Sequence, residues 1–227
     1  MAPRCQCTSA CSRPPLKGEA FCKEHATTCP VASPLSGYEP AYKPGVYNNQ
    51  ADIKDNNNCF AYAFLLADRP AQKNVPFHQP GLSAGFPKWS KIKGKRCPDL
   101  IARLKGDMPD IQMTTFEGTC PKGTSKVAVT VNAESDYHFY RQDQPKRGTR
   151  KAYWSHKPGS TEVTRRDATG HLVYNPELAD RDYTFKNDGL HYDHFCGFLC
   201  APRTRKLAFK RGGRSTRKAS KASKARK

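Results

Sequence analysis

The N-terminal cysteines constrain this chain most strongly, because the segment that carries them has few other means of folding. Five of the ten cysteines lie in the first 29 residues, which contain few large apolar side chains. A hydrophobic core therefore cannot hold residues 1–29 together. A metal ion bound by four side chains supplies folding energy directly. The sequence thus predicts a metal-binding module over residues 1–29.

The spacing of the ligand candidates is typical of a zinc site. They follow the pattern C-x-C-x3-C-x10-C-x2-H, and they are Cys5, Cys7, Cys11, Cys22 and His25. Zinc takes four thiolate or imidazole ligands, usually as two close pairs. We expect Cys22 and His25 to form one pair and Cys11 to be the third ligand, while Cys5 and Cys7 compete for the fourth place. A disulfide cluster or a loose segment of unused thiols is the alternative.

The stretch RCQCTSACSRPPLKGEAFCKEH, residues 4–25, also resembles a small Cys3His module common in proteins of large DNA viruses. The resemblance implies that Cys5, Cys11, Cys22 and His25 are the ligands. It also implies structural zinc as the cofactor.

Positive charge gathers at the other end of the chain. The formal net charge is +19, and residues 203–227 contribute 12 Lys or Arg without any Asp or Glu. Such a segment cannot bury enough apolar surface to fold alone, and its cations gain by displacing counterions from phosphate. We expect a tail that binds nucleic acid or another polyanion; a merely solubilising tail is the alternative. The candidate polyanion-binding residues are Arg203, Arg205, Lys206, Lys210, Arg211, Arg214, Arg217, Lys218, Lys221, Lys224, Arg226 and Lys227.

Signals for export and for membrane insertion are not found in the sequence. No stretch has the roughly 18 apolar residues that span a bilayer. The first residues, MAPRCQCTSACSRPP, lack the apolar core of a signal peptide. We therefore expect synthesis in a reducing cytosol. The cysteines are interpreted first as metal ligands or reactive thiols and only second as disulfides.

Between the two ends, the pattern predicts a Pro/Gly/Tyr-rich linker over residues 30–51 and one globular domain over residues 52–202. Helices are predicted over residues 59–67 and 97–105. Strands are predicted afterwards, over residues 126–132, 137–142, 152–156 and 195–200. Helices followed by an antiparallel sheet indicate the α+β class.

Cys59 is the candidate nucleophile of this domain. It follows three asparagines at the predicted start of a helix, where its pKa is lowered, and a nearby imidazole lowers it further. His138 and His156 lie on successive predicted strands, which can place one imidazole beside the thiol and a second behind it. The alternatives to a catalytic role are that Cys59 is a core residue and that His138 faces solvent. Cys196 and Cys200 are candidates for a disulfide or metal site with Cys59 or Cys97.

This order resembles the papain-like amidases, especially the NlpC-type cell-wall peptidases. The resemblance implies a papain-like fold with Cys59 as nucleophile, His138 as base and His156 as the orienting residue. A closer resemblance is to a little-characterised group from bacteria, large DNA viruses and some shell-matrix proteins. The matching motifs are NCFAYA (58–63), DYHFYRQD (136–143), WSHKPG (154–159) and DATGHLVYNPELADR (167–181). In the last motif Asp167, Asn175, Asp180 and Arg181 are expected to organise a loop over the site.

These features lead to three functional hypotheses. The leading one is a virion-associated basic protein of a large DNA virus, a minor capsid or core component on a papain-like scaffold. Its tail would bind DNA or another polyanion, its other partners would be virion proteins, and it would be made in the host cytoplasm without secretion. The alternative is an active cysteine peptidase or amidase. A third, weaker hypothesis is a nucleic-acid-binding regulator that uses the zinc module and the tail.

Overall fold

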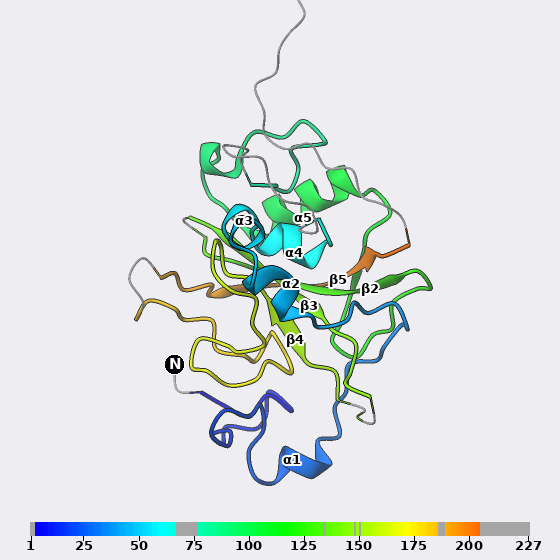
Figure 1. The fold of residues 1–227 in the computed structure, drawn as a ribbon, viewed down its shortest axis with the longest axis vertical. Coiled ribbons are helices and arrows are strands. Elements are labelled where there is room, and N and C mark those ends of the chain that lie inside the picture. The colour runs from blue at the N-terminus through cyan, green and yellow to red at the C-terminus, as the bar shows by residue number, and fades with distance from the viewer. Residues whose placement is uncertain are drawn as a thin grey trace, which may run out of the picture.

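A five-stranded antiparallel sheet forms the centre of the protein (Figure 1). The computed structural model describes residues 3–66, 77–133, 135–147, 149, 151–185 and 189–204. The strand order in the sheet is β1-β5-β2-β3-β4. The strands are β1 (Gln112–Thr114), β2 (Thr124–Val131), β3 (Tyr137–Gln142), β4 (Trp154–His156) and β5 (His194–Pro202).

Short helices precede the sheet, and three of them gather on one side of it in Figure 1: α3, α4 and α5. The helices are α1 (His25–Thr28), α2 (Pro44–Asn48), α3 (Ala51–Asn56), α4 (Cys59–Ala63), the 3-10 helix η1 (Trp89–Lys91) and α5 (Cys97–Asp107). The α+β class expected from the sequence is therefore confirmed. No helix in the described ranges is both long enough and apolar enough to cross a membrane.

Helix α4 begins where the sequence predicts but is shorter than predicted. Its N-cap is Asn58, whose side-chain oxygen accepts a hydrogen bond from the Ala61 N–H at 3.0 Å. The helix ends at Ala63 instead of residue 67, and Leu65 has a φ of 58°. A leucine in this left-handed conformation cannot continue a right-handed helix. The apolar run after Ala63 is therefore a turn that closes the core.

The sheet face that meets α4 and α5 is apolar, and we call it the helix face. Side chains alternate between the two faces of a strand, so every second residue of β2 and β3 points here. These strands contribute Val127, Val129, Val131, Tyr137 and Phe139, while the helices contribute Cys59, Phe60, Leu100 and Leu104. Burial of this cluster stabilises the fold through the hydrophobic effect.

The opposite face, which we call the loop face, has a different cover. Its strand residues include Ala128, Tyr140, Trp154 and Phe198. They pack against the N-terminal segment and the loop after β4 and not against helices, and these segments contribute Cys5, Phe21, Val173 and Tyr174. The N-terminal segment is thus part of the main body.

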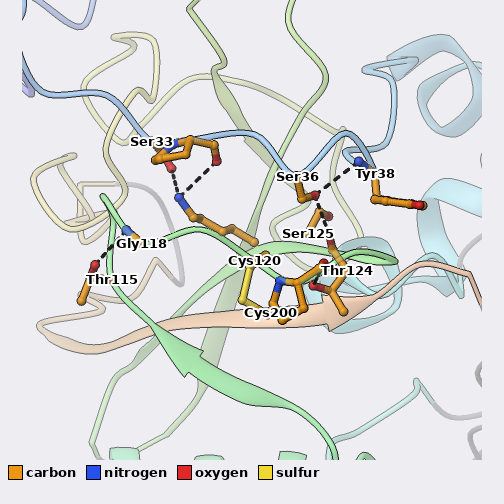
Figure 2. Close-up of a disulfide and its surroundings, with 12 residues drawn as sticks. Ser33, Ser36, Tyr38, Thr115, Gly118, Cys120, Thr124, Ser125 and Cys200 are labelled. Carbon is orange, nitrogen blue, oxygen red and sulfur yellow. Dashed lines mark hydrogen bonds between the residues drawn. A yellow bond between two sulfur atoms is a disulfide. The ribbon is translucent and has the colours of Figure 1, made fainter.

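The segment over residues 30–51, predicted as a linker, also packs on the body. Lys126 of β2 donates from Nζ to Ser33 Oγ at 2.7 Å, to the Pro34 carbonyl at 3.3 Å and to the Phe116 carbonyl at 2.7 Å. Figure 2 shows Ser33 and Ser36 beside the start of β2, where Ser36 Oγ donates to the Thr124 carbonyl. The segment also contains α2 and the first residue of α3.

Six of the ten cysteines form disulfides, which corrects the expectation that they are first metal ligands or reactive thiols. The pairs are Cys7–Cys29, Cys97–Cys196 and Cys120–Cys200, with Cα–Cα distances of 5.6, 5.1 and 5.4 Å. These separations suit a disulfide, and the fold alone creates them, because the partners are 22, 99 and 80 residues apart. Figure 2 shows the Cys120–Cys200 bond between the β1–β2 connection and β5.

A β-bulge on β5 explains why its two cysteines bind different partners. Thr130 of β2 pairs with Phe195, while Val129 pairs with Gly197, so Cys196 is the additional residue. The bulge directs Cys196 to α5 on the helix face. Cys200 pairs with Lys126 in the regular register and is bonded to Cys120.

Candidate functional site

The predicted metal ligands come together at the N-terminus. The ligand atoms of Cys5, Cys11, Cys22 and His25 all lie within 4.8 Å of one another. His25 Nδ1 is 3.3 Å from Cys5 Sγ and 3.5 Å from Cys22 Sγ, and the sulfurs of Cys11 and Cys22 are 3.9 Å apart. Tetrahedral ligands about 2.3 Å from a zinc ion are roughly 3.8 Å from one another. The four residues therefore fit a tetrahedral metal ion.

The disulfides decide between the two candidates for the fourth ligand. Cys7 is bonded to Cys29, so its sulfur is not available as a thiolate. Cys5 is buried and free, and burial raises the pKa of its thiol. A metal ion would replace the proton on such a thiol, since only the thiolate is a good ligand.

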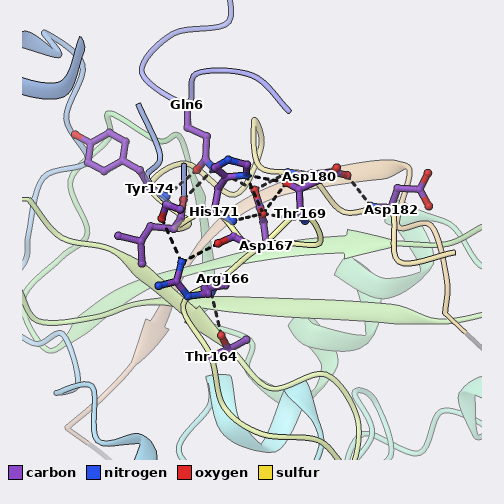
Figure 3. Close-up of polar contacts among 12 residues, drawn as sticks. Gln6, Thr164, Arg166, Asp167, Thr169, His171, Tyr174, Asp180 and Asp182 are labelled. Atoms are coloured by element: carbon purple, nitrogen blue, oxygen red, sulfur yellow. Dashed lines mark hydrogen bonds and ion pairs between the residues drawn. The ribbon is translucent and has the colours of Figure 1, made fainter. Parts of the chain in front are cut away.

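Gln6, between Cys5 and the disulfide-bonded Cys7, fastens this module to the domain. Its Nε2 donates to the Leu172 carbonyl at 3.0 Å and to Asp167 Oδ2 at 3.4 Å. Its Oε1 accepts from the Tyr174 N–H at 2.7 Å and from the Asn175 N–H at 3.1 Å. The side chain is 1% exposed, and Figure 3 shows it reaching into the loop after β4.

Asp167 organises that loop from within. Its Oδ1 accepts from the backbone N–H groups of Thr169 and His171, and its Oδ2 accepts from the Asp180 N–H at 3.3 Å (Figure 3). Arg181 closes the far end, because its guanidinium donates to the carbonyls of Pro176, Glu177 and Tyr192. These residues of the DATGHLVYNPELADR motif hold backbone in place. A hollow of about 420 Å³ lies beside the loop and is bounded by Asp167, His156 and Tyr183 among others.

Cys59 is the first residue of α4 and lies against β3. Its Sγ donates a long hydrogen bond to the Tyr137 carbonyl at 3.7 Å, and the side chain packs with Phe139 in the helix-face core. Burial raises the pKa of the Cys59 thiol far above its ordinary value. The thiol is therefore protonated near neutral pH in this structure.

His138 and His156 are in direct contact on the loop face. His138 Nε2 is 2.7 Å from His156 Nδ1, and His156 Nε2 is 2.8 Å from the Arg166 carbonyl. A carbonyl only accepts, so His156 Nε2 carries the proton that it donates to Arg166. When His156 is neutral, it accepts at Nδ1 from the N–H of His138, and His138 Nδ1 is then a basic nitrogen. Burial and the neighbouring His156 lower the pKa of His138 well below its ordinary value.

The structure brings the two histidines together but does not join Cys59 to them. Tyr137 and Phe139 point to the helix face with Cys59, whereas His138 points with Tyr140 to the other face. Within the described residues, Cys59 Sγ makes no hydrogen bond to either imidazole. The thiol thus lies beside the backbone of the strand that carries His138, without the thiolate–imidazole contact of an activated nucleophile.

Only the first of the predicted polyanion-binding residues can be located. Arg203 donates from Nε to Ser125 Oγ at 2.7 Å and from Nη1 to the Ala63 carbonyl at 2.8 Å. Its guanidinium is therefore engaged with the domain, in contrast to the free tail expected from the sequence. The other eleven predicted residues, from Arg205 onwards, lie outside the described residues.

Sequence reasoning missed a buried ionic network on β3 and β4, which meets α4 on the opposite sheet face from the histidines. Asp143 accepts from Arg165 Nε at 2.8 Å, from Arg141 Nε at 3.3 Å and from Ser155 Oγ at 2.7 Å. The Tyr62 hydroxyl, 2.7 Å from Ser155 Oγ, links the network to α4. A signal for it was present in DYHFYRQD, where an arginine and an aspartate are two residues apart and so share one strand face. Gln6 was also missed, although its position between two cysteines made it conspicuous.

Comparison with known proteins gives one informative match. No protein-family model matches the chain. No solved structure matches it either. Insoluble matrix shell protein 1 of Ruditapes philippinarum is 30% identical over 154 residues, which are 67% of this chain and 85% of that protein. Similarity of this extent establishes common family membership. The chain therefore belongs to the same family as insoluble matrix shell protein 1.

Proposed function

We propose that this chain is a structural assembly protein that binds nucleic acid or another polyanion through its C-terminal tail. We favour assembly over catalysis because of Cys59, whose thiol is buried, protonated and without a hydrogen bond to an imidazole. The relative named above is by its name a component of an insoluble shell matrix. We propose an assembly role for this chain as well.

We propose that the domain is a papain-like scaffold. The order of the elements supports this, because a helix that begins at Cys59 packs on β3, which carries His138, and β4 follows with His156. A scaffold of this kind can persist in a protein that no longer catalyses a reaction, since fold does not determine function.

Zinc is the metal that we propose for the Cys3His cluster. Three sulfurs and one imidazole nitrogen suit zinc better than calcium or magnesium, which prefer oxygen ligands. All four positions are filled by the protein, which is typical of structural sites, whereas catalytic sites keep one position open.

The tail is proposed as the polyanion-binding element on the basis of its charge. Residues 205–227 contain eleven Lys or Arg and no acidic residue. A polyanion bound by such a segment loses affinity steeply as salt rises, because binding releases condensed counterions. DNA is the polyanion that we propose.

Binding of a short DNA duplex, measured by fluorescence anisotropy between low and physiological salt, tests this proposal. The matched variants keep the chain length and replace either the eleven Lys and Arg of residues 205–227 or eleven uncharged tail positions with glutamine. The first variant should lose most of the affinity and most of the salt dependence, and the second should lose little. Unchanged binding in the first variant would overturn the proposal.

A virus particle is the setting that we propose for this assembly, with other virion proteins as neighbours and with synthesis in the host cytoplasm. The resemblance of residues 4–25 to modules of large DNA viruses motivates it. The three disulfides persist best in an oxidising environment, so the protein would become oxidised after assembly. Quantitative mass spectrometry of purified particles should find many copies of the chain at a constant number per particle. A number of copies per particle that decreases as the particles are purified further would contradict a place in the virion.

A cysteine peptidase or amidase is the second candidate, and one observation favours it. The contacts from His138 to His156 and from His156 to the Arg166 carbonyl suit a general base, since a neutral His156 would leave a basic nitrogen on His138. In that mechanism His138 would take the proton of Cys59 as the thiolate attacks an amide carbonyl. An electrophilic activity probe should then label the protein, and the label should disappear in both Cys59→Ala and His138→Gln. The assembly proposal expects no labelling of the folded protein.

A further inference from the structure

A second concentration of positive charge lies on the folded domain. The range 77–98 contains five Lys or Arg and no Asp or Glu. All five fall within residues 88–96, which we call the cationic loop: Lys88, Lys91, Lys93, Lys95 and Arg96. Four of the five are exposed, Lys95 being half-buried. The proposed tail function makes no use of this loop.

Apolar residues within the loop anchor it to the helix face. Trp89 is 3% exposed, its indole N–H donates to the Ser135 carbonyl at 3.2 Å, and its ring meets Tyr137 edge-on at 5.3 Å. Ile92 packs against the same core. Lys95 donates from Nζ to the Ser135 carbonyl at 3.0 Å. The buried positions therefore alternate with exposed lysines, which gives the lysines a defined location.

Arg103 of α5 supports the loop from below. Its Nη1 donates to the carbonyls of Pro80 at 3.2 Å and Pro87 at 2.8 Å. Its guanidinium lies 5.2 Å from the Phe86 ring and 5.5 Å from the Trp89 ring. This cation is occupied by the fold, and its position holds the segments before and within the loop against α5.

The exposed lysines, by contrast, do not hold other parts of the fold in place. In the part of the chain that the structure describes, the side chains of Lys88, Lys91 and Lys93 make no hydrogen bond and no ion pair. Arg96 is 4.0 Å from Asp99, a contact on the surface that contributes little. Three neighbouring cations without an acidic partner repel one another, so a bound external anion would stabilise the loop.

We propose that the cationic loop is a second contact for the phosphate backbone of duplex DNA, used together with the tail. This inference rests on the proposed polyanion-binding function. Four of the five cations are lysines, whose compact ammonium groups act as point charges on phosphates. Ammonium and guanidinium groups both bind phosphate oxygens, so the lysines and Arg96 together complement the closely spaced charges of a DNA backbone.

The loop and the start of the tail lie on the same side of the sheet. Arg203 donates to the Ala63 carbonyl at the end of α4. The next predicted tail residue, Arg205, follows two positions later. Ala63 and Trp89 belong to the same buried cluster on the helix face. One DNA molecule can therefore meet both elements, and the first contact raises the effective concentration for the second.

The test compares two full-length variants that each lose three positive charges. One is Lys88→Gln/Lys91→Gln/Lys93→Gln in the loop, and the other removes three scattered exposed lysines, Lys17→Gln/Lys43→Gln/Lys146→Gln. Thermal unfolding checks that both fold. We expect the loop variant to lower the slope of log K against log salt for a DNA duplex by about 2 to 3, at about 0.9 per lost phosphate contact. The scattered variant should change it by less than half as much.

The outcomes separate this inference from the tail proposal. Equal slopes in the loop and scattered variants overturn the inference, and the tail proposal stands if the glutamine tail still abolishes binding. If the loop variant binds DNA with a reduced salt slope but the glutamine tail variant binds like the native chain, the tail proposal is wrong and the loop inference is supported. If the loop variant loses affinity for poly-glutamate but keeps its affinity for DNA, the partner is an acidic protein and the inference is wrong.

Discussion

The helix face and the loop face use the same strands but bury different chemistry. The helix face is mainly a packed apolar core between β2, β3, α4 and α5, with the Arg141–Asp143 network at its β4 side. The loop face contains the histidine pair and is covered by the N-terminal module, where the buried Gln6 makes four hydrogen bonds. Apolar packing is additive and tolerant, whereas a buried polar network fails when one partner is lost. The two faces should therefore respond differently to the same experiments.

Metal removal should have the largest effect, and it should act on the loop face. Zinc bound by such sites contributes about 10 kcal/mol or more of apparent binding free energy, which is coupled to folding. A strong chelator should lower the melting temperature and speed hydrogen exchange over residues 165–182, because Gln6 connects Cys5 to that loop. Exchange in β2 should change less. As a control, the chelator should have no further effect on Cys22→Ser, and equal changes on both faces would break the comparison.

Truncation of Phe139 tests the helix face. Its ring is fully buried between Phe60, Phe64 and Tyr137. Phe139→Ala should lower the free energy of unfolding by about 3 to 5 kcal/mol through lost burial and a cavity. Phe185→Ala, at a side chain that is 65% exposed, should cost less than about 0.5 kcal/mol. Denaturant titration measures both, and similar values would contradict the apolar core described for this face.

Gln6→Ala sharpens the comparison because it removes polar contacts and hardly any apolar packing. It leaves the N–H groups of Tyr174 and Asn175 and the Leu172 carbonyl without their partner. Buried groups left in this way cost about 1 to 3 kcal/mol each, so we expect a loss of about 3 kcal/mol. The exposed Gln144→Ala is the matched control. A near-neutral Gln6→Ala would show that the module is not fastened by this side chain.

The smallest expected effect is a pH dependence from His138. Its pKa is lowered in the folded protein, so below about pH 6.5 the unfolded chain binds a proton that the folded chain does not. Stability from this group is complete above pH 6.5 and falls by about 1.4 kcal/mol per pH unit below it. Unfolding measured from pH 7.5 to 5 should show this loss in the native chain and in His194→Gln. In His138→Gln the contribution of about 1.4 kcal/mol per pH unit should be missing from the loss.

The strands were the most predictable part of the fold, because their alternating or β-branched patterns are local. β3 has the predicted bounds, and α5 begins at the predicted Cys97. Cys97–Cys196 was one of several pairings that the sequence left open, whereas Cys7–Cys29 and Cys120–Cys200 were not expected, because only the fold brings such distant partners together. The helices within residues 30–56 were missed because Pro, Gly and Asn obscure their periodicity.

The Cys3His cluster was the best predicted feature, because its spacing is local, and the Cys7–Cys29 disulfide leaves Cys5 as the fourth candidate ligand, a choice that spacing alone left open. The catalytic role of Cys59 stays a prediction. The sequence could place a helix that begins with Cys59 before two strands that carry His138 and His156, but it could not show which sheet face each side chain occupies. That property depends on strand register, and a shift of one residue would have put His138 on the same face as Cys59.

The position of Cys200 has a mechanical consequence. It lies four residues before Thr204, the last described residue, and is bonded across to Cys120. A pull on the C-terminal tail therefore reaches a covalent cross-link after only the end of β5 has been peeled away. The load then passes through Cys120 into the β1–β2 connection, and Cys97–Cys196 holds the other end of β5 to α5. A protein tethered by its tail to a long polymer can in this way bear tension without unravelling its sheet.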